Sequence, residues 1–279
     1  MKTLTILVLA FVIALTSCTS SEKKPQVAYD LVSSTSGISV EKFDEEITDE
    51  NKYNYNNEVF KVGTKFTYDF QHFTPENEVK YFKVHDDQKS WDFVDENNED
   101  SNAVKNVIIG TLSGNPMSKW VPDYDQTAIS YQFKENTPFS ISGVIENEAN
   151  IWMHPPRDQY FKILELNPFP YIKAPYEVGT KWNWRLQIGG QWGDERWKTW
   201  KGNIENIYQY EITAKKNIDT SLGNLECFVV ESTAKSRLGE TALTAYFHQK
   251  YGFVKLDYTN INQSKTLLEL VEHSEGKTL

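Results

Sequence analysis

Cysteine is nearly absent from this sequence of 279 residues, which contains only Cys18 and Cys227. Two cysteines are too few for the disulfide framework of a small secreted domain. Basic residues are also scarce, since 29 lysines and arginines stand against 39 acidic residues and give a net charge of −10. Because nucleic-acid phosphates demand a basic face, this balance argues against nucleic-acid binding and against charge-driven attraction to anionic lipid headgroups.

Motifs that mark common reactions are missing as well. None of the five histidines lies in a His-Glu-x-x-His zinc helix, and no glycine-rich phosphate loop is present. Gly110-Thr111-Leu112-Ser113-Gly114 has the wrong spacing for a nucleophile elbow. The acidic loop from Asp95 to Asp100 lacks the central glycine and closing glutamate of a calcium loop. We therefore expect no catalytic residue, no metal and no cofactor.

The N-terminus has the features of an export signal. Lys2 supplies a positive charge, and residues 3–16 carry no charge and are mostly apolar. This run is too short to span a membrane, which takes about 20 apolar residues, but it has the length of a secretory signal core. The sequence therefore predicts an exported protein whose residues 1–17 are removed.

At the end of this run, Leu15-Thr16-Ser17-Cys18 combines an apolar residue, two small residues and a cysteine. These residues resemble the lipobox of bacterial lipoproteins. The resemblance implies cleavage before Cys18, acylation of Cys18 and a membrane anchor made of acyl chains. Thr19 stands where an aspartate would retain enterobacterial lipoproteins in the inner membrane, so the resemblance favours the outer membrane and leaves the side of that membrane open.

Residues 18–57 are polar and rich in acidic and asparagine residues, and we interpret them as a flexible tether. Val27 to Val40 has enough apolar content to add an edge strand. From Glu58 onward, aromatic and polar residues alternate, as in Phe66, Tyr68 and Phe70, which predicts half-buried strands. Long helical periodicity is absent apart from a turn around Pro156 to Leu164. We expect a mainly β fold of curved antiparallel sheet, half-barrel or sandwich-like.

One short sequence motif occurs twice. Phe60 to Tyr68 and Tyr176 to Trp184 both contain Val-Gly-Thr-Lys, and aromatic residues follow it in each copy. Two related β units, residues 58–174 and 175–279, are one explanation. A recurring turn and strand is the other. The first range ends in a proline-rich bridge from Met153 to Tyr171, which we predict to be a loop wrapping between the units, since proline cannot donate to a sheet ladder.

Three short motifs occur in the range 175–272: Val178-Gly179-Thr180-Lys181-Trp182, Gly223-Asn224-Leu225-Glu226-Cys227 and Gly252-Phe253-Val254-Lys255. With them, this range resembles the TapB-like family of bacterial envelope proteins. The resemblance implies a curved antiparallel sheet similar to half-barrel carriers of lipids and lipoproteins, and it brings no catalytic group. Cys227 lies in a strand-like run, and we expect a small buried hydrophobic side chain there.

Two features are candidate ligand contacts. In His154-Pro155-Pro156-Arg157, the prolines fix the backbone so that His154 and Arg157 could form an anion-recognising corner; the alternative is a structural connection in which Arg157 pairs with a carboxylate. Five of the eight tryptophans fall between residues 182 and 200. Trp192, Trp197 and Trp200 could stack on sugar rings or line an apolar mouth, or simply cover the open end of the sheet.

Taken together, these features favour a non-enzymatic envelope lipoprotein. Its β unit would hold an apolar or amphipathic ligand, or a partner protein, in the concavity of a curved sheet. A surface glycan-binding protein that uses the three tryptophans is the second hypothesis. A hydrolase is the third, because two catalytic carboxylates can lie far apart in a sequence.

Overall fold

The computed structural model describes residues 31–33, 38–41, 57–87, 89–98, 102–120, 126–133 and 140–276. The predicted signal peptide (residues 1–17), Cys18 and most of the predicted tether lie outside these residues. The described chain is mainly antiparallel β structure, which confirms the expected fold class. No helix in the described ranges is long and apolar enough to cross a membrane.

The N-terminal part of the chain supplies mostly short strands. They are β1 (Leu31–Ser33), β2 (Ile38–Glu41), β3 (Lys65–Phe73), β4 (Val79–Val84), β5 (Trp91–Asp95), β6 (Ala103–Val104), β7 (Asn106–Thr111), β8 (Thr127–Gln132), β9 (Ser140–Glu146), β10 (Asn150–Met153) and β11 (Tyr171–Lys173). Two 3-10 helices, η2 (Pro116–Lys119) and η3 (Gln159–Leu166), lie among them.

The C-terminal part supplies longer strands. They are β12 (Lys181–Gly189), β13 (Asn203–Thr220), β14 (Gly223–Ser236), β15 (Gly239–His248), β16 (Gly252–Thr259) and β17 (Lys265–Ser274). The 3-10 helix η4 (Gly190–Trp192) follows β12. β13 is one continuous strand of 18 residues.

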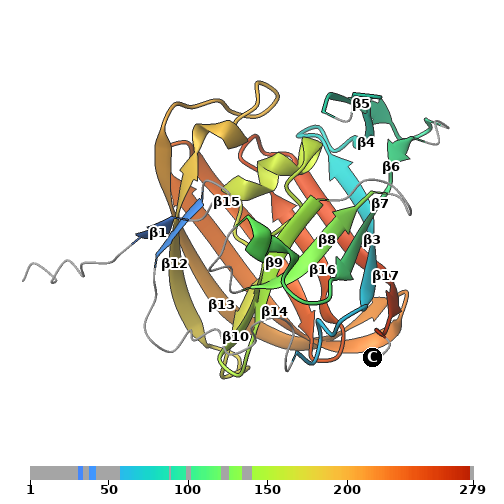
Figure 1. Cartoon of the computed structure of the whole chain (residues 1–279), viewed down its shortest axis with the longest axis vertical. Coiled ribbons are helices and arrows are strands. Elements are labelled where there is room, and N and C mark those ends of the chain that lie inside the picture. The colour runs from blue at the N-terminus through green and yellow to red at the C-terminus, as the bar shows by residue number, and fades with distance from the viewer. Residues whose placement is uncertain are drawn as a thin grey trace, which may run out of the picture.

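All of these strands belong to one sheet, which curls into a barrel-like shape (Figure 1). Successive antiparallel pairs run from β12 through β17, then to β3, β7, β8, β9, β10 and β11. The pairing of β17 with β3 joins the two halves of the chain directly. On the other side of β12 lies β2, so the range from Val27 to Val40 does contribute strands to the sheet.

The repeated Val-Gly-Thr-Lys motif has the same local structure in both places. Gly63 and Gly179 have φ angles of 80° and 97°, which favour glycine. In the first copy the Gly63 N–H donates to the Thr111 carbonyl on a neighbouring strand, and the Thr111 N–H donates to the Thr64 carbonyl. In the second copy Gly179, Ile212 and Thr180 form the same two hydrogen bonds. Aromatic side chains then point into the core. This common turn fits both explanations of the repeat, and a duplication stays a prediction.

The chain's own segment between β10 and β11 fills the inside of the curved sheet. This corrects the expectation of a wrapping loop. Its apolar side chains are at most 2% exposed: Tyr160, Phe161, Ile163, Leu164, Leu166 and Phe169. They contact aromatic residues of the sheet and of the β4–β5 hairpin, including Phe70, Phe82 and Trp184. Proline does not exclude this placement, because a central segment needs no ladder partner along its whole length.

Polar side chains of the sheet hold this segment at its C-terminal end. The Leu166 carbonyl accepts hydrogen bonds from Asn206 Nδ2 (3.0 Å) and Thr241 Oγ1 (2.8 Å). Asn167 in turn donates from Nδ2 to the Thr259 carbonyl at 2.9 Å. Helix carbonyls without an intrahelical partner must be satisfied when they are buried. These strand side chains meet that need and fix η3 inside the barrel.

Thr241 offers a test of this attachment. We expect Thr241→Val, which keeps the shape and removes the hydroxyl donor, to lower the free energy of unfolding by about 1–2 kcal/mol, because the Leu166 carbonyl loses a buried partner. The matched control is Thr244→Val on the outer face of the same strand, with an expected change within about 0.5 kcal/mol. Chemical denaturation measures both. Equal losses in the two variants would contradict the role given to Thr241.

Candidate functional site

The predicted corner at His154 and Arg157 is a buried ionic group. Arg157 Nη2 lies 2.8 Å from His154 Nδ1, and Arg157 Nε lies 2.8 Å from Glu165 Oε1. The side chains of Arg157 and Glu165 are 11% and 0% exposed. Burial, and then the charge of Arg157, hold the pKa of His154 well below its usual range. Burial raises the pKa of Glu165 while Arg157 opposes that shift.

This geometry favours the structural interpretation of the corner. Arg157 is already paired with a carboxylate of η3, the very segment that fills the barrel, and its guanidinium lies 5.2 Å from the centre of the Trp192 ring. The Tyr131 hydroxyl donates to the His154 carbonyl. His154 and Arg157 therefore both contact other parts of the chain. The Glu165 carboxylate takes the place of the external anion that they could recognise.

The three tryptophans are placed against protein rather than solvent. Trp192 and Trp197 are 9% and 7% exposed, and Trp197 stacks on Trp91 with the ring centres 6.2 Å apart. Trp200 is partly buried and its Nε1 donates to the Ile188 carbonyl at 3.4 Å. A sugar stacks on an accessible ring face, so the burial of Trp192 and Trp197 removes the observation on which the glycan hypothesis depended.

The same region ties the β4–β5 hairpin to the loop after η4. Arg196 stands over the Trp91 ring at 3.5 Å, and its Nη1 donates to the Trp91 carbonyl at 2.7 Å. Asp194 accepts two hydrogen bonds from the same guanidinium. The hairpin shares two register pairs with β3 and two with β6, and the contacts of Arg196 and aromatic packing add to this attachment.

Beneath the hairpin, the interior contains a polar network centred on Tyr160. The Tyr160 hydroxyl lies 2.8 Å from His72 Nδ1 and 2.5 Å from Thr266 Oγ1, and Asn260 Nδ2 donates to that Thr266 oxygen at 2.9 Å. His72 is 4% exposed and stacks on the ring of Phe93. Burial lowers the pKa of His72 to about 4, with a backbone hydrogen bond to Lys265 opposing part of the shift.

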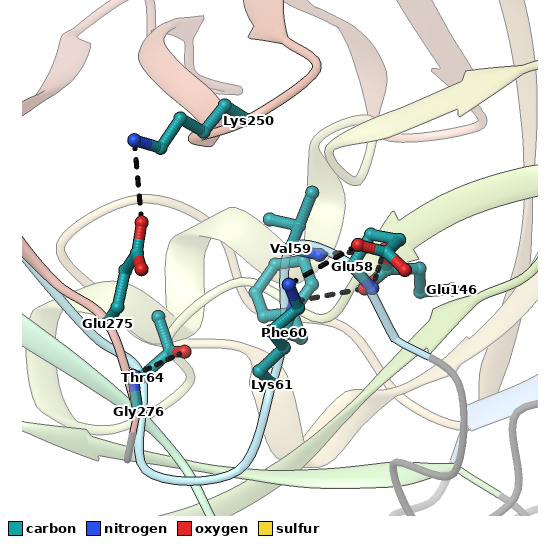
Figure 2. Close-up of polar contacts among 9 residues, drawn as sticks. All are labelled: Glu58, Val59, Phe60, Lys61, Thr64, Glu146, Lys250, Glu275 and Gly276. Atoms are coloured by element: carbon teal, nitrogen blue, oxygen red, sulfur yellow. Dashed lines mark hydrogen bonds and ion pairs between the residues drawn. The ribbon is translucent and has the colours of Figure 1, made fainter. Parts of the chain in front are cut away.

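Where the described range 57–87 begins, a buried carboxylate binds the backbone. Glu146 is 5% exposed and accepts hydrogen bonds from the backbone N–H groups of Glu58, Val59 and Phe60 at 2.8–2.9 Å (Figure 2). The C-terminal end lies near the same turn, where the Gly276 N–H donates to Thr64 Oγ1. Glu146 therefore fixes the backbone of residues 58–60 to β9, and no sequence motif indicated Glu146 for this role.

A hollow of about 650 Å³ lies on the outer face of β12 to β15. Its floor is the backbone of four residues in register, Trp182, Tyr210, Ser232 and Leu243, whose side chains point into the barrel. Polar side chains of the residues next to them in sequence form its walls. We call it the outer groove. Alternation predicted that these residues face solvent, but the sequence alone gave no sign that they gather around a hollow.

Chemically, none of these regions has the arrangement of a metal centre or a reactive thiol. Among the described residues, no group of three or more histidine, cysteine or acidic side chains could hold a metal ion. Cys227 is fully buried, as expected, and burial raises the pKa of its thiol to about 11. The thiolate is the nucleophilic form of cysteine, so this side chain packs rather than reacts.

Comparisons with known proteins found similarity in structure alone. No family model and no curated protein match the sequence. An exported protein from Bacteroides fragilis, described as having a YmcC-like fold, has a TM-score of 0.42 and 10% identity over 77% of this chain and 97% of its own. A lipoprotein from Parabacteroides distasonis has a TM-score of 0.37 and 8% identity, with the same coverage of 77% and 97%.

The Escherichia coli lipoprotein YmcC is a third similar structure, with a TM-score of 0.32 and 9% identity over 84% of this chain and 92% of its own. At such identities and scores these structures assign no family or function to the chain. The TapB-like resemblance of residues 175–272 stays a prediction.

His72 gives the interior a pH dependence that can be measured. Its pKa is about 4 when folded and about 6.5 when exposed, so the unfolded chain binds the proton first as pH falls. The stability that depends on neutral His72 is complete above pH 6.5 and is lost between pH 6.5 and 4, by about 3 kcal/mol. We expect the deficit of His72→Gln, measured by denaturation, to shrink across that window. Parallel curves for the two proteins would contradict the prediction.

Proposed function

We propose that this chain is a lipid-anchored, non-enzymatic protein of the bacterial cell envelope that binds a partner protein on the outside of its barrel. Three lines of argument support the proposal. They are the N-terminal sequence, the interior that is filled by the chain's own η3 segment, and the contacts that the buried titratable groups make with one another.

The anchor is inferred from the sequence. Leu15-Thr16-Ser17-Cys18 follows an apolar run of signal-peptide length, and Cys18 is placed for acylation. Several acyl chains together anchor a protein stably, because each buried CH₂ contributes roughly 0.8 kcal/mol. Thr19 favours the outer membrane by its resemblance to enterobacterial lipoproteins. The side of that membrane stays open.

The filled interior is the observation that favours a partner protein over an apolar ligand. An apolar ligand in the concavity would compete with Phe161, Leu164 and Phe169, each 0% exposed and packed against the sheet. Expelling η3 would also break its hydrogen bonds to Asn206 and Thr241 of the sheet and take the charged Glu165 out of its buried position. Burying an unpaired charge or polar group costs several kcal/mol. A partner is therefore bound more readily on the outer face.

A non-enzymatic role agrees with the use of the buried titratable groups. His72 and Tyr160 contact one another, and Arg157 joins His154 to Glu165. These contacts place η3 and are closed off by aromatic rings such as Phe93 and Trp192. A general acid or base must reach its substrate within hydrogen-bond distance, and His72, His154 and Glu165 lie under the protein's own side chains.

Metabolic labelling with a palmitate analogue tests the anchor. We expect the full-length protein to take up label and to fractionate with membranes, and Cys18→Ser to lose both properties, since the thiol of Cys18 is the proposed acylation site. Cys227→Ser is the matched control and should keep the label, because Cys227 is buried in the folded chain. Label retained by Cys18→Ser would overturn the assignment.

Native mass spectrometry tests the filled interior. We expect the gently purified Cys18→Ser protein to show the mass of the polypeptide alone, because η3 occupies the space that a lipid would need. A second mass of lipid size, released on denaturation, would restore the apolar-ligand hypothesis and contradict the partner-binding proposal. The two experiments are independent, since the first concerns residue 18 and the second the barrel.

A further inference from the structure

The outer groove has a distribution of charge that identifies the kind of partner it fits. Side chains at register positions across neighbouring strands lie side by side on one face of a sheet. Lys181 is opposite Glu211, Glu211 is opposite Glu231, and Glu231 is opposite Thr244. One wall of the groove is therefore this row of charged and hydroxyl side chains, which runs across all four strands.

Two carboxylates in this row stand directly opposite one another. Glu211 has a partner, because Lys181 Nζ lies 3.0 Å from its Oε2. Glu231 is exposed and forms no ion pair with any residue that the structure describes. Like charges directly opposite one another destabilise a pair of antiparallel strands. A cation placed beside Glu231 would relieve this repulsion, so the groove favours a positively charged group at that position.

The opposite wall is neutral and able to form hydrogen bonds. It consists of Asn183, Gln209 and Thr233, which are exposed and in register across β12, β13 and β14. The register shift between Ile212 and Ala214 adds Thr213 to the lining. Amide and hydroxyl side chains donate and accept, so this wall suits the peptide groups of an extended backbone.

The floor is firm, because the side chains beneath it are packed. Trp182 and Tyr210 stack inside the barrel with an interplanar angle of 3° and ring centres 5.1 Å apart, and the Ser232 hydroxyl donates to the Leu243 carbonyl. From β12 to β15 the groove crosses three strand spacings, about 14 Å in all, which matches about four residues of an extended chain. Its size therefore fits a short peptide segment.

We propose that the outer groove binds an extended segment of a partner protein and that a lysine or arginine of this segment pairs with Glu231. This inference rests on the proposed partner-binding function and names the chemistry of the partner. The segment crosses β12 to β15 with its cation at Glu231 and its backbone along Asn183, Gln209 and Thr233. The pairing weakens with added salt, because both charges are near the surface.

Fluorescence anisotropy with a labelled peptide of alternating threonine and lysine tests this inference, using the full lipidated protein in detergent. We expect saturable binding that weakens about fivefold in Glu231→Gln, the effect of losing one exposed ion pair. The matched control is Glu226→Gln, on the same strand but outside the groove and paired with Lys215, and it should bind as the unaltered protein does. A threonine–glutamate peptide should not bind.

Three outcomes would overturn the inference. They are no binding of the lysine peptide, equal affinity in Glu231→Gln and the unaltered protein, and displacement of the peptide by an equal concentration of the polyamine spermidine. The last would show recognition of a cation without a backbone. None of these results changes the palmitate label or the mass of the polypeptide, so failure of the groove is distinguishable from failure of the proposed function.

Discussion

The structure depends on one constraint: the concave face of a strongly curved, aromatic-rich sheet must be kept from water. Here the covering is internal. The segment between β10 and β11 places η3 in the barrel, where Tyr160, Phe161 and Leu164 replace solvent. Since a buried 3-10 helix leaves carbonyls without partners at its end, the sheet must supply donors. Asn206 and Thr241 do so at Leu166.

This constraint explains the positions of the buried polar groups. His72 and Thr266 of the sheet contact the Tyr160 hydroxyl of η3. Arg157, which precedes η3 in the same segment, pairs with Glu165 of η3, so these contacts either join η3 to the sheet or hold the segment to itself. Buried polar networks fix one arrangement of a core when they are satisfied. In the sequence these side chains resemble chemically active groups, but in the structure they attach an internal segment. The outer face is the surface left for a partner.

The strands could be predicted from sequence because each half-buried strand alternates apolar and polar residues, as β3 and β12 do. The placement of η3 could not, since the segment's own sequence does not say that it lies inside the sheet and the flanking prolines indicate a loop. The burial of Trp197 depends on Trp91, 106 positions earlier in the chain. No local pattern carries that contact, whereas pairing of Arg157 with a carboxylate is one of the two interpretations of its motif, and the structure identifies Glu165 as the partner.

The outer groove lies between these two cases. Alternation identifies Glu211 and Glu231 as outward-facing. They lie opposite one another because of the register of β13 with β14, which is regular from Ile207 to Ile212 and shifts between Ile212 and Ala214. A one-residue change of register would move either side chain to the other face. The strands are locked in register by the inward row that includes Tyr210 and Ser232. The packing of the interior thus holds two like charges together on the outside, and the cost of that arrangement is what a cationic partner would remove.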